Sequence, residues 1–156
     1  MIPIVEQIAQ ALVARLETVS VAGGYETDVA RVARPTKTGG YPLEDRLVVL
    51  LQDDPVEDTD LEGAGSLKAW VQPFRILCFV LPSDTETTPV DTRINTLRAD
   101  VEKAVRVDPT LGGLATDAVI RAPEGWTVRD TAFEGVTVNV DVHYRTAEDD
   151  PYAQGG

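Results

Sequence analysis

Apolar and polar residues alternate without a break between residues 135 and 145, near the end of the chain. Every second side chain from Val136 to Tyr144 is apolar, and the intervening ones, from Thr137 to Arg145, are polar. This period of two predicts a β-strand with one face on a core and one face in water, and valine and tyrosine both favour strands. A strand of roughly 30 Å needs neighbours on both edges and a cover on its valine face. We therefore expect the rest of the chain to supply a sheet and a layer that covers it.

Two segments, residues 4–19 and 90–105, carry apolar side chains at spacings of three and four. This spacing places the apolar side chains on one stripe of a helix, and Asp100 falls on the opposite, charged face of the second helix. Pro89 suits the first helical turn, where its missing N–H costs nothing, and Thr88 is the expected N-cap. Both stripes need burial, and the valine face of the long strand is the available partner.

The remaining strands are expected at residues 25–32, 47–51, 68–81, 116–122 and 127–133. The run Leu47–Leu51 is apolar throughout, which is typical of a strand buried on both faces. Pro73 has no N–H to donate, so we expect it at a bulge or on a sheet edge. The order helix, strands, helix, strands predicts an α+β fold, a mainly antiparallel sheet with two amphipathic helices packed on one face. We expect residues 1–146 to form a single domain, followed by a polar C-terminal tail, residues 147–156.

The formal net charge of −12 makes free nucleic acid an unexpected ligand, because affinity for phosphates rests on lysine and arginine. Two explanations of this charge stay open, namely solubility and an acidic wall past which DNA slides without sticking. The single cysteine, Cys78, lies in an apolar run and is interpreted as a buried, inert thiol. The amino terminus lacks the basic region of a signal peptide, and no apolar run reaches the length of a membrane span. We expect a protein made in the cytoplasm, with no membrane partner.

Signals for catalysis are weak. The one histidine, His143, lies on the polar side of the long strand, and no nucleophile motif accompanies it. Phosphate-binding glycine loops are absent from the sequence, and no cysteine and histidine cluster is spaced to hold zinc. We therefore expect no catalytic residues, no cofactor and no metal, and a binding or structural role in place of an enzyme.

Two polar segments and the tail are candidate contact regions. Residues 34–41 are rich in glycine and proline and carry scarce cations, which indicates either a solvated loop or an arm that docks on a partner subunit. Residues 53–62 are strongly acidic, but their spacing does not fit a calcium loop; a solvated loop, an electrostatic docking surface and a metal site stay open. The polar face of the long strand meets solvent, a channel or a neighbour. The candidate interface residues are Arg34, Lys37, Tyr41, Asp53, Asp54, Glu57, Asp58 and Tyr152.

The order of elements, together with the ending His143 to Tyr152 (HYRTAEDDPY), resembles the tail terminator, or tail completion, proteins of long-tailed phages and their gene-transfer-agent homologues. The resemblance implies a homo-oligomeric ring, commonly a hexamer, that caps the head-proximal end of the tail tube. Such a ring stops tube growth and docks on the neck, and DNA passes through its lumen. It implies a virion protein, made in the host cytoplasm, whose partners are the tail tube protein and the head–tail connector.

The family implies no catalytic residues, since its rings work by matching surfaces. On this basis the 34–41 loop would reach a neighbour or the tube, the acidic segment would face the lumen or a basic partner, and the tail would dock on an adjacent subunit. A tail-tube or head–tail connector subunit is the alternative within the structural class. A small enzyme or ligand-binding domain is the alternative outside it, and a deep pocket with titratable groups would favour that.

Overall fold

The computed structural model of the chain describes residues 1–36, 42–58, 67–83, 85–122, 127–129 and 132–154. In these ranges the helices are α1 (Ile4–Glu17) and α2 (Val90–Val107). The strands are β1 (Arg31–Ala33), β2 (Leu47–Gln52), β3 (Val56–Glu57), β4 (Leu67–Val80), β5 (Asp117–Arg121), β6 (Thr127–Arg129) and β7 (Glu134–Ala147). The predicted α+β class is confirmed.

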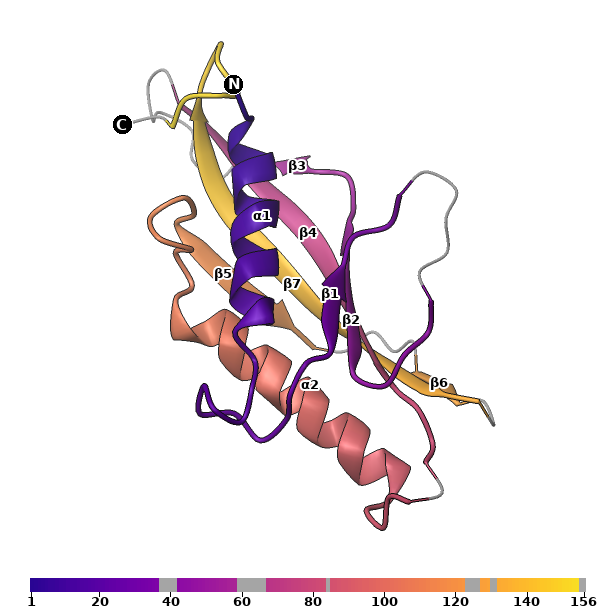
Figure 1. Ribbon diagram of the computed structural model, residues 1–156. Coiled ribbons are helices and arrows are strands. Elements are labelled where there is room, and N and C mark those ends of the chain that lie inside the picture. Colours follow the sequence, from indigo (N-terminus) through magenta and orange to yellow (C-terminus); the bar gives the residue numbers. More distant parts are fainter. Residues whose placement is uncertain (37–41, 59–66, 84, 123–126, 130–131, 155–156) are drawn as a thin grey trace.

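Strands β4 and β7 form a long antiparallel ribbon through the middle of the molecule (Figure 1). Their pairing runs without interruption from Leu67 opposite Ala147 to Val80 opposite Glu134. Among the described residues the sheet has the order β1-β2-β4-β7-β5, β3 adds to the edge of β4, and β6 adds to the edge of β7. Of the strand pairings in the described ranges, only that of β1 with β2 is parallel. The long strand thus has neighbours on both edges, as its pattern predicts.

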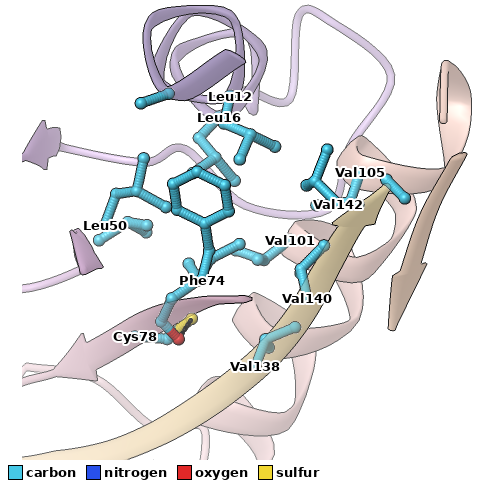
Figure 2. Close-up of a cluster of buried hydrophobic side chains, with 14 of the residues drawn as sticks. Leu12, Leu16, Leu50, Phe74, Cys78, Val101, Val105, Val138, Val140 and Val142 are labelled. Atoms are coloured by element: carbon cyan, nitrogen blue, oxygen red, sulfur yellow. Dashed lines mark hydrogen bonds between the residues drawn. The ribbon is translucent and has the colours of Figure 1, made fainter. Parts of the chain in front are cut away.

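The core lies between the helices and the even-numbered side chains of β7. Figure 2 shows Leu12 of α1, Val101 of α2, Phe74 of β4 and Val140 of β7 converging on one another. Each of these four side chains is completely buried. Both helices contribute to this core, and α2 is the helix that contacts β7 directly. The N-cap position of α2 is Pro89, without a side-chain cap, so the prediction of Thr88 as the cap is wrong, because the helix begins one residue later.

The second face of the sheet is not uniformly wet, contrary to prediction. Thr137 and Asn139 are each only 6% exposed. Beside them lies a second apolar cluster, formed by Leu47, Val49, Leu77 and Phe79. Strand β2 contributes to both clusters, which confirms that it is buried on both faces. Further along β7, Asp141, His143 and Arg145 are half-buried. The second face therefore changes from apolar to polar along the ribbon.

The strand expected at residues 25–32 is mostly absent. Only Arg31–Ala33 pair with β2. The backbone N–H groups of Glu26 and Thr27 instead donate to the Asp100 carboxylate of α2, at 3.1 and 2.8 Å. Asp100 is 4% exposed, so its expected place on the solvent face of the helix is also wrong. Its burial is tolerated because backbone donors and the Thr27 hydroxyl, at 2.6 Å, satisfy the carboxylate.

Pro73 lies opposite the break between β2 and β3. The Asp53 N–H donates to the Pro73 carbonyl over 3.1 Å, which is half of an antiparallel pair of bonds. The returning bond would need an N–H on Pro73, which proline lacks. The buried Gln72 side chain supplies that donor, because its amide nitrogen binds the Asp53 carbonyl. Pro73 therefore lies at neither the predicted bulge nor a sheet edge, because β4 is an inner strand with unbroken pairing to β7; the neighbouring strand is interrupted instead.

The C-terminal segment folds back onto the body of the chain. β7 continues through Ala147, one residue past the expected end of the domain at residue 146. The N–H of Ala147 then donates to the carbonyl of Ala153 at 2.9 Å, and the N–H of Ile4 donates to Pro151 at 3.1 Å. The Gln154 amide reaches the carbonyl of Gly113 at 2.8 Å. These bonds hold residues 148–154 against the start of α1 and the turn after α2, at one end of the ribbon (Figure 1).

Candidate interface at the end of the ribbon

Arg34, the first candidate of the glycine-rich segment, contacts its own chain. Its guanidinium group forms two hydrogen bonds with the Glu6 carboxylate of α1, at 2.7 and 3.2 Å. The bond from Arg34 lowers the pKa of Glu6 below its ordinary value. Lys37 and Tyr41 lie outside the described residues. Arg34 therefore fixes the start of this segment to α1, and docking of the segment on a partner stays a prediction.

The described part of the acidic segment runs along the ribbon and is not simply a solvated loop. Asp53 pairs with Arg75 of β4 through two short contacts, at 2.9 and 3.0 Å. Asp54 and Glu57 are exposed, and the backbone N–H of Asp58 donates to Ala69 at 2.8 Å. Within the described ranges, no group of three or more histidine, cysteine or acidic residues is placed to hold a metal. The exposed carboxylates thus face outward from a fixed backbone.

Strand β4 brings the acidic segment and the tail to the same end of the molecule. β3 pairs with β4 at Val71 and Trp70, on one edge of β4. β7 pairs on the other edge, where Lys68 lies opposite Thr146. Two regions that are about 90 positions apart in the chain, at Pro55 and at residues 147–151, therefore line one hollow of about 280 Å³.

We call this cavity the ribbon-end hollow; it is lined by Val5, Pro55, Lys68, Trp70, Tyr144, Thr146, Ala147, Glu148, Asp149 and Pro151. Trp70 and Tyr144 are directly opposite each other on β4 and β7. The Trp70 indole N–H donates to the Thr146 hydroxyl at 3.2 Å, and the Lys68 ammonium lies 5.9 Å from the indole ring centre. Burial raises the pKa of Tyr144. The hollow thus has an aromatic base and a charged rim.

A second, more polar hollow of about 300 Å³ lies at the same end of the ribbon, and its lining includes Asp58, Asp117, His143 and Arg145. Asp117 and His143 are cross-strand partners in β5 and β7, a separation at which side chains interact. The Thr116 hydroxyl donates to the His143 carbonyl at 3.0 Å, so it is directed to backbone and not to the imidazole. The lone histidine therefore has a charged neighbour, but the nearby hydroxyl is not set up as a nucleophile.

None of the candidate interface residues predicted from the sequence lines the ribbon-end hollow. The acidic segment contributes Pro55 and the tail contributes Ala147, Glu148, Asp149 and Pro151, while Lys68, Trp70 and Tyr144 were not predicted at all. The positions of the two aromatic residues in their strands could have indicated a site. Trp70 and Tyr144 have the same parity as the core-facing residues of their strands, yet each stands near the strand end that adjoins an acidic segment. Tyr152, the tail candidate, is 41% exposed beside the hollow-lining Pro151. Its docking on an adjacent subunit stays a prediction.

Comparison of the chain with protein-family models and with curated proteins finds no match. Neither helix of the described chain has both the length and the apolar character that crossing a bilayer requires.

Proposed function

We propose that this chain is a structural subunit of a phage virion, a tail terminator whose ring caps the head-proximal end of the tail tube. The observation that carries the proposal is the ribbon-end hollow. Pro55 of the acidic segment and the carboxylate-bearing start of the tail, distant in sequence, line it around an aromatic pair on the two-stranded ribbon. An aromatic centre with a polar rim is the usual composition of a protein docking surface.

The size of the two hollows at the ribbon end favours docking over catalysis there. The two at the ribbon end measure about 280 and 300 Å³, at or below the lower end of typical small-molecule clefts. The core beneath the helices is filled by aliphatic and aromatic side chains. These features support a protein that works through its surface.

The edges of the sheet suit assembly into a ring. Among the described residues, β1 pairs only with β2, and β5 pairs only with β7. An outer strand keeps unpaired backbone groups that a neighbouring chain can bind. Different edges on one subunit allow head-to-tail contacts, which close into a ring when the rotation fits. The net charge of −12 further suits a lumen through which DNA passes, because acidic walls repel phosphates.

The proposal is tested by the behaviour of the purified chain and by its effect on tails. Native mass spectrometry and electron microscopy should show closed rings, alone or on the ends of purified tail tubes, and particles made without the protein should carry overlong or headless tails. A tail-tube subunit would instead polymerise into open tubes, and a connector would bind heads and leave tube length unchanged. A chain that stays monomeric and leaves tube growth unaffected would refute the proposal.

A further inference from the structure

We infer that the ribbon-end hollow binds a cationic side chain, preferentially arginine, on a basic segment of the protein partner. The inference deepens the proposed function, on which it rests for the identity of the partner as tail tube or neck. It concerns a binding chemistry that the residues of the hollow define by themselves.

The indole of Trp70 provides the first element of the site. Tryptophan is the strongest of the aromatic rings in attracting a cation to its face. The molecule already places a cation there, since the Lys68 ammonium lies 5.9 Å from the ring centre. Lys68 therefore shows that this position accepts a positive charge, and it competes for the position in the free protein.

The carboxylates of Glu148 and Asp149 provide the second element. Both residues are exposed and both line the hollow, where they outnumber the ammonium of Lys68 among the described lining residues. A guanidinium group donates two parallel hydrogen bonds to a carboxylate and also stacks on an aromatic ring. Arginine satisfies both elements at once, whereas an anionic ligand would meet two carboxylates.

The rim is positioned before a ligand arrives. The segment that carries the two carboxylates is bounded by the bond from Ile4 to Pro151, at 3.1 Å, and the bond from Ala147 to Ala153, at 2.9 Å. Trp70 is oriented by its bond to Thr146, at 3.2 Å. Preorganisation lowers the entropy that binding costs, so even a single side chain should bind measurably.

The experiment uses the full chain labelled with ¹⁵N and two small probes, N-acetyl-arginine methylamide and its neutral analogue N-acetyl-citrulline methylamide. The readout is the Trp70 indole N–H resonance, identified by its loss in Trp70→Phe. We expect a saturable shift with the arginine probe, with a Kd on the order of millimolar, and no saturable shift with citrulline. Equal responses to both probes, or no response to either, would overturn the inference.

Variants separate the roles of the rim residues. Glu148→Gln with Asp149→Asn should weaken arginine binding by about threefold to tenfold. Lys68→Gln should strengthen it, because the internal competitor is gone. Glu17→Gln removes an exposed carboxylate of α1 outside the hollow and should leave binding unchanged. Equal weakening by Glu17→Gln would show a general charge effect and would refute the site.

The two proposals fail separately. A chain that forms rings on tail tubes but does not distinguish arginine from citrulline overturns only the inference about the hollow. A chain that binds the arginine probe as expected, yet stays monomeric and leaves tubes unaffected, overturns only the tail-terminator proposal.

Discussion

The buried amide of Gln72 supplies the donor that Pro73 lacks, and this relation gives a sharp stability prediction. Gln72 is 0% exposed, and its amide nitrogen binds the carbonyls of Asp53 and Pro73. Replacement by methionine keeps the length and approximate volume of the side chain but removes both bonds, together with a longer one that Gln72 Oε1 accepts from Gln52 at 3.4 Å. The Asp53 carbonyl then remains in the protein without its donor.

The size of the effect follows from the contacts. An unsatisfied buried acceptor costs about 1–3 kcal/mol, and the methionine recovers part of this through apolar contact. We therefore expect Gln72→Met to lower the free energy of unfolding by about 2 kcal/mol. This cost arises because Pro73 has no N–H to replace the lost amide donor, so a second substitution at residue 73 should change the cost of Gln72→Met.

Pro73→Ala restores a backbone N–H opposite the Asp53 carbonyl, since the Asp53 N–H already bonds the Pro73 carbonyl. Alone it should cost about 0.4–1 kcal/mol, because proline restricts the unfolded chain. In a chain that already carries Pro73→Ala, the substitution Gln72→Met should cost about 1 kcal/mol less than in the parent. The two substitutions should thus be coupled.

The measurement is urea unfolding of the parent, both single variants and the double variant, followed by circular dichroism. A double-mutant cycle isolates the coupling. Additive effects, within about 0.5 kcal/mol, would show that the Gln72 amide does not replace a missing Pro73 N–H, and the argument for the break between β2 and β3 would be wrong.

Three further predictions concern groups whose surroundings the structure defines. Asp100→Ala should cost about 2–4 kcal/mol, because the N–H groups it binds lose their acceptor; Asp100→Asn should cost less, and equal costs in urea unfolding would contradict this. Burial raises the pKa of Cys78 to about 12, so Ellman's reagent at about pH 8 should label it only on unfolding, and rapid labelling of the native chain would exclude that burial. Arg34→Ala should raise the pKa of Glu6 towards its ordinary value of 4.5, as followed by carbon NMR. Because the folded pKa of Glu6 is lowered, the pair stabilises the fold at pH values above the unfolded pKa. The free energy of unfolding lost in Arg34→Ala should be below about 1 kcal/mol for this exposed pair, and the loss should vanish as the pH falls through the folded pKa. A loss that persists at that low pH would show that Arg34 stabilises the fold through packing instead.

The elements of the core were predictable because their signals are local. The alternation from Val136 to Tyr144 places every second side chain on one face of an extended chain, and β7 buries that face. The spacing of three and four in residues 4–19 similarly places one stripe on one face of α1. Backbone geometry alone imposes these periods, so a short stretch of the sequence is enough to predict each of these elements.

Other features of the fold could not be predicted from a short stretch of the sequence. The strand expected from residue 25 is replaced by bonds from Glu26 and Thr27 to Asp100, over 70 positions away. Thr137 and Asn139 look like solvent-facing residues, but the second apolar cluster lies beside them. In each case the partner comes from another part of the chain, and only folding brings it close.

The candidate site shows the same division. The sequence by itself determined that residues 53–58 and 147–152 are acidic and polar, and that Trp70 and Tyr144 belong to strands. Only the tertiary structure decided that Pro55, the two aromatic residues and part of the tail line one hollow, because the register of β4 against both β3 and β7 sets which side chains meet. Register depends on the packing of the whole sheet against the helices, since a shift of one residue would turn the valine face of β7 away from its core.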